Sequence, residues 1–228
     1  MKIVFMGTPD IAKGCLQKLI DEKLDVVGVV TQADKPIGRG KKMGMPPVKE
    51  LALEHNIPVY QPAKARDEEF INTLKEIKPD LIIVVAYGQI LPKALLDIPK
   101  FGCVNVHVSL LPKYRGAAPI NWVIINGEQK TGVTTMYMNE GLDTGDIILQ
   151  SEFALSDEIT AGELHDIMME QGGELLVETI DKIKNNCAPR IPQNDEESSY
   201  APMMNKALGN IDFSKTAKEI HNLVRGVN

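Results

Sequence analysis

Hydrophobic residues along the chain fall into short apolar runs that alternate with segments of helical spacing. The runs rich in Val, Ile and Leu predict strands over residues 2–6, 26–30, 81–86, 104–108 and 133–138. The first three are almost continuously apolar, as is typical of parallel strands covered on both faces. Apolar positions at helical spacing predict helices over residues 11–22, 48–55 and 68–77. This alternation predicts an α/β fold with a Rossmann-like, mostly parallel sheet and helices on both faces.

The last third of the chain changes character twice. Thr160 and Glu163 match a capping box, which predicts a helix from there to about residue 184. Residues 187–204 are rich in Pro, Asn, Asp, Glu and Ser, which predicts a linker. Beyond it, Ser214 resembles an N-cap, and one helical stripe is formed by Ala217, Ile220, His221 and Val224.

Length and composition narrow the class of protein. Because one helix cannot fold alone, we expect a domain over residues 1–186 and the start of another over 205–228. The three cysteines are widely spaced, without a CxxC pair, which suits a reducing cytoplasm. With 31 acidic and 25 basic residues, the net charge of −6 disfavours binding nucleic acid by overall charge, but it leaves a local basic patch open. No apolar run approaches the ~20 residues of a membrane helix, and the His and Cys positions show no metal-ligand spacing.

Two polar residues interrupt an apolar strand. Asn105 and His107 are two positions apart and therefore share one face of the strand over 104–108. One interpretation is a buried structural pair that is satisfied by hydrogen bonds. The other is chemistry, because an Asn amide can donate to a developing oxyanion and a His can move a proton near pH 7.

A glycine-punctuated loop over residues 139–146 favours the chemical interpretation. We expect it at the carboxyl end of the sheet, where a carboxylate can orient the imidazole and relay a proton. Both Asp143 and Asp146 are candidates. Ser109 lacks the G-x-S-x-G context of a hydrolase nucleophile. Asn, His and Asp without a nucleophile are typical of direct transfer to an amine rather than of an acyl-enzyme.

Several motifs in order carry a family resemblance. The segments 105–107 (NVH), 109–112 (SLLP), 114–122 (YRGAAPINW) and 141–147 (GLDTGDI) resemble the folate-dependent formyltransferases. The segments 4–9 (VFMGTP) and 31–36 (TQADKP), followed by GRGKK at 38–42, are similar to the branch of that superfamily that acts on methionyl-tRNA.

The resemblance implies roles for particular residues. It implies a catalytic triplet of Asn105, His107 and Asp143 that transfers formyl from 10-formyltetrahydrofolate, without a metal, to the α-amine of methionyl initiator tRNA. It also implies a tetrahydrofolate site that is formed by Ser109, Leu110, Leu111, Pro112, Ile90, Leu91, Gly141 and Leu142.

A basic loop over residues 34–49 is either a solvated surface loop or an arm that contacts phosphates. The resemblance favours the arm, with Arg39, Lys41 and Lys42 as tRNA-binding residues. It also implies that the segment 205–228 begins a second domain, so that this chain keeps donor chemistry but engages tRNA less well. Because the sequence shows no targeting segment, we expect a cytoplasmic protein, and we expect it to be a monomer. Two alternatives stay open: a formyltransferase that acts on a small amine such as an amino-sugar nucleotide, and a non-catalytic folate- or RNA-binding module.

Overall fold

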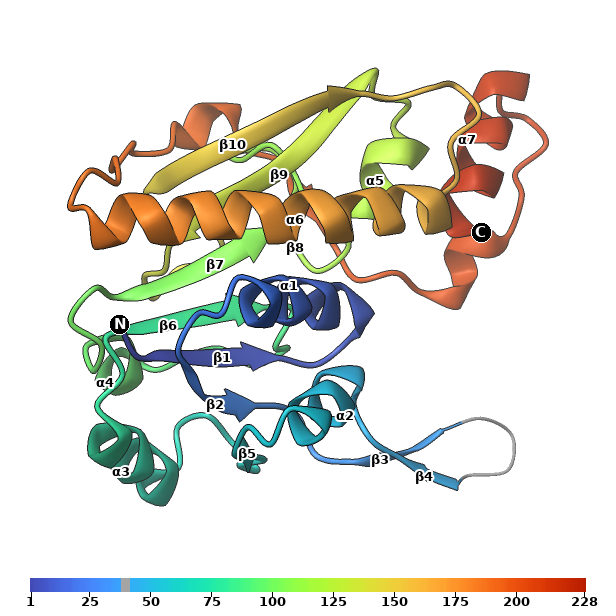
Figure 1. Cartoon of the computed structure of the whole chain (residues 1–228). Coiled ribbons are helices and arrows are strands. Elements are labelled where there is room, and N and C mark those ends of the chain that lie inside the picture. Colours follow the sequence, from blue (N-terminus) through green and yellow to red (C-terminus); the bar gives the residue numbers. More distant parts are fainter. Residues whose placement is uncertain (38–41) are drawn as a thin grey trace.

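A seven-stranded sheet forms the centre of the molecule in a computed structural model that describes residues 1–37 and 42–228 (Figure 1). The strand order is β10-β9-β7-β6-β1-β2-β5. The strands from β5 to β7 are parallel, and β9 runs antiparallel to both of its neighbours. The strands are β1 (Ile3–Gly7), β2 (Val26–Val30), β5 (Val59–Tyr60), β6 (Leu81–Val85), β7 (Cys103–His107), β9 (Lys130–Tyr137) and β10 (Ile147–Ala154).

Helices cover both faces of this sheet, which confirms the predicted fold class. The apolar cluster on one face includes residues of α1 (Asp10–Asp21), α2 (Pro47–Glu54) and α6 (Ala161–Lys184). The cluster on the other face includes residues of α3 (Glu68–Ile77) and α4 (Lys93–Leu96). The remaining elements are β3 (Lys35–Ile37), β4 (Lys42–Gly44), β8 (Arg115–Gly116), α5 (Pro119–Ile125), β11 (Tyr200–Ala201), α7 (Ala217–Val227) and two short 3-10 turns, η1 (Asp195–Glu197) and η2 (Lys206–Gly209). Among the described residues, no helix is both long and apolar enough to span a membrane.

Glycines allow α1 and α6 to pack closely. A Cβ on Gly172 of α6 would lie 3.4 Å from both Cys15 Sγ and Val106 Cγ1, at ordinary van der Waals distance, so the backbone of α6 approaches closely here. The approach is tighter at Gly14 of α1, where a Cβ would collide with the Met169 side chain of α6. This contact offsets the low helix propensity of mid-helix glycine. The predicted capping box at the start of α6 is confirmed.

The last helix differs from its prediction. Thr216, not Ser214, caps α7, and its Oγ1 accepts from the amide of Glu219 at 3.2 Å. The predicted stripe of Ala217, Ile220, His221 and Val224 lies on this helix but is not its buried side, since Val224 is 48% exposed. The side of α7 that faces the protein is polar or small, and its buried residues are Asn222, Arg225 and Gly226. The Arg225 guanidinium donates to Asn222 and to the Ile159 carbonyl, which satisfies its buried charge.

The segments predicted as a linker and as a basic loop occupy different sides of the molecule. Residues 187–204 run from α6 towards β8, with which β11 pairs in parallel. The boundaries at 186 and 204 stay a prediction. β3 and β4 form an antiparallel hairpin that extends away from the sheet (Figure 1). Arg39 and Lys41 lie outside the described residues, and Lys42 begins β4.

Candidate active site

Asn105 and His107 lie on the face of β7 that α6 does not cover. Their neighbours Val104 and Val106 point the other way and belong to the apolar cluster that includes α1 and α6. Strand alternation therefore turns the two polar side chains away from that cluster. His107 is only 6% exposed, so its ring nitrogens need hydrogen-bonding partners from the protein.

The loop that carries Asp143 does not start where the sequence predicts. Because β9 is antiparallel to β7, its last residues lie beside the amino end of β7, where Tyr137 is paired with Val104. The loop must therefore turn back to reach His107. Gly145 permits this turn, since a Cβ there would collide with the Tyr137 carbonyl. The expectation of a loop at the carboxyl end of the sheet is wrong, but its carboxylate still reaches the predicted partners.

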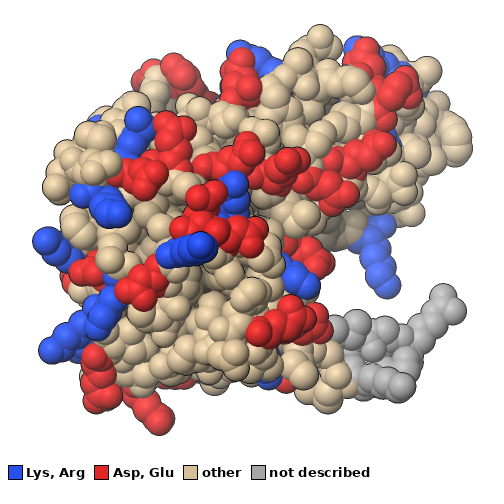
Figure 2. Space-filling view, in the orientation of Figure 1, with Lys and Arg blue, Asp and Glu red and all other residues tan. Residues whose placement is uncertain are grey.

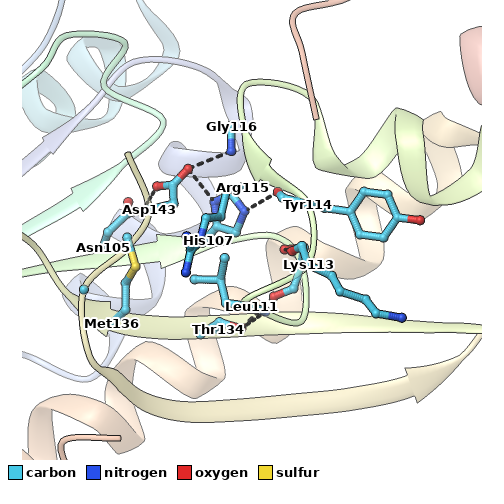
Figure 3. Close-up of polar contacts among 12 residues, drawn as sticks. Asn105, His107, Leu111, Lys113, Tyr114, Arg115, Gly116, Thr134, Met136 and Asp143 are labelled. Atoms are coloured by element: carbon cyan, nitrogen blue, oxygen red, sulfur yellow. Dashed lines mark hydrogen bonds and ion pairs between the residues drawn. The ribbon is translucent and has the colours of Figure 1, made fainter. Parts of the chain in front are cut away.

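Asp143 joins the two polar residues of β7 (Figure 3). Its Oδ1 accepts from Asn105 Nδ2 at 3.4 Å, and its Oδ2 lies 3.7 Å from His107 Nδ1. The backbone amide of Gly116 donates to the same Oδ2 at 2.8 Å. Asp146, the other candidate, instead faces Arg190 at 3.5 Å. The structure thus brings Asn105, His107 and Asp143 together and separates Asp146 from them.

The second ring nitrogen of His107 has a fixed partner. Its Nε2 lies 2.9 Å from the Tyr114 carbonyl, which can only accept, so Nε2 carries the hydrogen. This leaves Nδ1 on the side of Asp143 as the nitrogen that can take up or release a proton (Figure 3). The arrangement therefore places an imidazole nitrogen, a carboxylate and the Asn105 amide side by side.

Tyr114 is itself firmly anchored. Its hydroxyl donates to Glu128 at 2.6 Å and accepts from Asn126 at 3.1 Å. Burial, together with the bond to Glu128, raises the pKa of Tyr114 to about 12, so the phenol keeps its proton at neutral pH. Its backbone lies in the left-handed region, with φ at 62°, which is uncommon for a bulky residue. Such a conformation turns the carbonyl towards His107 and needs support from its surroundings.

The predicted folate residues fall into two groups. Ser109 is fully buried and its hydroxyl donates to the Lys113 carbonyl at 2.7 Å, so that hydroxyl is already engaged. Leu91 and Leu111 are buried, and Leu110 and Pro112 are half-buried. The exposed group includes two large apolar side chains, Ile90 at 85% and Leu142 at 54%, and the loop residue Gly141. None of the eight lines the cavity of about 230 Å³ beside Asn139 and Glu140.

Sequence reasoning missed three contributors to this site. Tyr114 and Gly116 act through backbone atoms, which no pattern of side chains reveals. Gln193 bonds the carbonyls of Asp143 and Gly145, yet it lies in the segment interpreted as a linker. The only available signal was the motif over 114–122, which contains the first two without indicating a role.

A second polar network lies at the base of the β3–β4 hairpin. Lys49 Nζ donates to both carboxylate oxygens of Asp34, at 2.8 and 2.7 Å, and to Gln61 at 2.9 Å. Gln61 in turn donates to Asp34 and to the Gln32 carbonyl. Lys49 therefore anchors the basic loop to the protein instead of projecting its charge from it.

The chain matches the family model described as formyl transferase over residues 1–180. It is 73% identical over 228 residues to a methionyl-tRNA formyltransferase from Clostridioides difficile (strain 630), which covers 100% of this chain and 74% of that protein. A methionyl-tRNA formyltransferase from Alkaliphilus oremlandii (strain OhILAs) is 62% identical, covering 99% of this chain and 73% of that protein. The solved N-formyltransferase from Helicobacter canadensis, in complex with folinic acid and dTDP-3-aminofucose, is 27% identical with a TM-score of 0.78, covering 99% of this chain and 80% of that one. This chain belongs to the formyl transferase family.

Proposed function

We propose that this chain transfers the formyl group of 10-formyltetrahydrofolate to the α-amine of methionyl initiator tRNA, for translation initiation in the cytoplasm. The observation that carries the proposal is the intact cluster of Asn105, His107 and Asp143 in a chain that is 73% identical to a methionyl-tRNA formyltransferase. A folate-derived donor is supported by the family match and by the solved relative in complex with folinic acid.

In the proposed reaction, the methionyl amine attacks the formyl carbon directly. As the new C–N bond forms, the formyl oxygen gains negative charge, and the Asn105 amide and the Nδ1–H of protonated His107 can donate to it. The amine then loses a proton, N10 gains one, and the bond between N10 and the formyl carbon breaks. Tetrahydrofolate is the leaving group, so no acyl-enzyme is needed. Asp143 accepts the proton and passes it on, while it stabilises the imidazolium of His107.

The donor pocket is proposed from the same elements. A turn is formed by Ser109, Leu110, Leu111 and Pro112. Two hydrogen bonds from the sheet fix it, because Thr134 donates to the Ser109 carbonyl at 2.6 Å and Gln150 donates to the Leu111 carbonyl at 2.9 Å. We propose that this turn, with Leu91, forms the rigid side of the tetrahydrofolate site. Gly141 and the exposed apolar side chains of Ile90 and Leu142 would be covered by the bound pterin, which would remove them from water.

The acceptor tRNA is proposed to bind along the basic hairpin. Arg39, Lys41 and Lys42 supply cations for phosphates, while Asp34 and Lys49 hold the base of the hairpin in place. The acidic net charge does not oppose this, because much of it lies elsewhere. Figure 2 shows acidic side chains gathered over the face formed by α6, whose sequence has six acidic residues and two lysines. That helix packs on the face of the sheet that is opposite His107.

The test presents two acceptors to the purified chain with the same formyl donor. We expect tetrahydrofolate release and formylated product with methionyl-tRNA, and neither with dTDP-3-aminofucose. Product with the amino sugar alone would replace the proposed acceptor by a small amine. Donor binding without release of tetrahydrofolate with either acceptor would overturn catalysis and favour a non-catalytic folate- or RNA-binding module.

A further inference from the structure

Residues 191–201, which we call the strap, run along the catalytic cluster. At its start, Ile191 exchanges two backbone hydrogen bonds with Ile147 of β10, at 2.8 and 3.0 Å. At its end, β11 pairs with β8, and the Arg115 amide donates to the Ser199 carbonyl at 2.9 Å. The strap is thus fixed both to the strand that follows the Asp143 loop and to the segment that contacts His107.

Both the nitrogen and the oxygen of the Gln193 side-chain amide form hydrogen bonds with residues of the site. Its Nε2 donates to the carbonyls of Asp143 and Gly145, at 2.9 and 2.8 Å. Its Oε1 accepts from Arg115 Nε at 3.0 Å and from Arg115 Nη2 at 2.8 Å. Two donors and two lone pairs are all that an amide group offers. Gln193 therefore ties the Asp143 loop to β8, whose Gly116 amide holds the Asp143 carboxylate.

Asp143 needs this support because of its backbone. Its φ is 53°, in the left-handed region that residues with a Cβ seldom adopt. Such a conformation persists only where neighbouring contacts determine it, and the two bonds from Gln193 act on the carbonyls at and just after this residue. A shift of that backbone would move the carboxylate away from His107 Nδ1.

Ser199 of the strap supports the other partner of His107. Its Oγ accepts from the Tyr114 amide at 2.9 Å. Tyr114 also has a left-handed backbone, and its carbonyl accepts from His107 Nε2. One segment therefore contacts the main chain at both residues that face the ring nitrogens of His107.

We propose that the strap positions the catalytic histidine: Gln193 sets Asp143 against Nδ1, and Ser199 sets Tyr114 against Nε2. Both are positioning residues, because they act through main-chain atoms of other residues. The inference deepens the proposed function and rests on it. It assigns a role in catalysis to a segment whose composition is that of a linker.

The first test is Gln193→Glu. The new carboxylate keeps the acceptor for Arg115 but loses both N–H donors and faces two carbonyl oxygens. We expect kcat for formyl transfer to methionyl-tRNA to fall by about 10- to 100-fold, the usual effect of small misplacements of catalytic groups, with KM for both substrates little changed. The control is Glu196→Gln, which neutralises an exposed carboxylate that makes no side-chain hydrogen bond to the described residues and should leave kcat near the wild-type value. A Gln193→Glu variant with wild-type kcat would overturn the role of Gln193.

The second test uses two adjacent serines. Ser199→Ala should lower kcat by about 2- to 10-fold, which is the effect of one hydrogen bond, and Ser199→Thr should restore it because the hydroxyl returns. Ser198→Ala is the matched control, since its hydroxyl donates within the strap to the Asp195 carbonyl at 2.7 Å. Equal losses in the two alanine variants would show a general effect of the strap and would overturn the role of Ser199.

A third measurement separates the inference from the proposed function. The ring-nitrogen NMR signals of His107 report its tautomer whether or not the chain turns over. When the imidazole is neutral, we expect the Nε2–H form in the wild type and a mixture of tautomers in Gln193→Glu and Ser199→Ala. If the wild type transfers no formyl group, the proposed function fails, but these signals still decide the positioning role. Folded variants with unchanged His107 signals would overturn it. If Gln193→Glu does not fold, the Ser199 variants carry the test.

Discussion

Two polar networks lie on this sheet, and they are assembled in different ways. The network around the proposed catalytic residues joins residues up to 85 positions apart, because Ser199 bonds Tyr114, and Gln193 bonds Arg115 and the Asp143 loop, from beyond α6. The network of Asp34, Lys49 and Gln61 at the base of the hairpin has partners within 30 positions. The proposed catalytic groups are thus fixed by the chain as far as residue 201, whereas the hairpin is anchored locally. Chemistry and acceptor binding should therefore respond separately to substitutions.

The strongest way to break the first network is His107→Ala. Loss of a positioned acid and base should lower kcat by about 10²- to 10⁴-fold. The donor should still bind, because the turn over residues 109–112, which we propose lines the folate site, is held by Thr134 and Gln150 instead of by His107. Single-turnover formyl transfer and a donor-binding titration would check this. A large loss of donor affinity with a near-normal kcat would sink the catalytic assignment.

Asp143→Asn tests the carboxylate while preserving its shape. Without the charge, the imidazolium of His107 loses its counterion, and we expect kcat to fall by about 10²-fold. The same loop offers a matched control in Asp146→Asn, because Asp146 faces Arg190 and not His107. The kcat values of Asp143→Asn and Asp146→Asn should therefore differ by most of this 10²-fold factor. Equal losses would mean that the loop tolerates no change of charge, whichever carboxylate is removed.

Much of the fold was predictable because periodicity is local. The strands β1, β2 and β6, and the capping box of α6, follow from runs that each contain their own signal. The last helix was predicted as well, but its packing face was not, because α7 packs through hydrogen bonds of Asn222 and Arg225. A polar interface of that kind has no periodic hydrophobic signature.

The site was predictable only as far as side chains reveal it. Asn105 and His107 stand out on an apolar strand, and the resemblance selected Asp143 over Asp146. The antiparallel course of β9 changed the route of the loop, since pairing direction is a long-range property. The amide of Gly116 and the carbonyl of Tyr114 contribute through the main chain, and Gln193 lies in a polar stretch where composition suggests no contact.

The next prediction concerns the basic hairpin that Asp34, Lys49 and Gln61 anchor. Arg39→Ala should remove one proposed phosphate contact, weaken tRNA binding by about 5-fold near physiological salt and lower the salt slope by about 1. The kcat at saturating tRNA should be unchanged, because the catalytic network does not depend on the hairpin. Lys75→Ala on α3 is a control that removes one exposed charge elsewhere. An unchanged salt slope for Arg39→Ala would show that this residue makes no phosphate contact.

The smallest effect should be a pH dependence at the base of the hairpin. Hydrogen bonds from Lys49, and next from Gln61, hold the pKa of Asp34 below its ordinary value of 3.8. The folded chain therefore binds this proton less tightly than the unfolded chain, so the contribution of Asp34 to stability is full above about pH 4 and is lost as pH falls through the lowered pKa. Asp34→Asn removes that contribution. Urea unfolding between pH 6 and 2.5 should show a small destabilisation of Asp34→Asn that is constant near neutral pH and shrinks in acid. Lys49→Met removes the main cause of the pKa shift, so the stability of this variant should depend less on pH over the same acidic range. If the stability difference between Asp34→Asn and the wild type stayed undiminished in acid, it would contradict the anchoring role of Asp34 and Lys49.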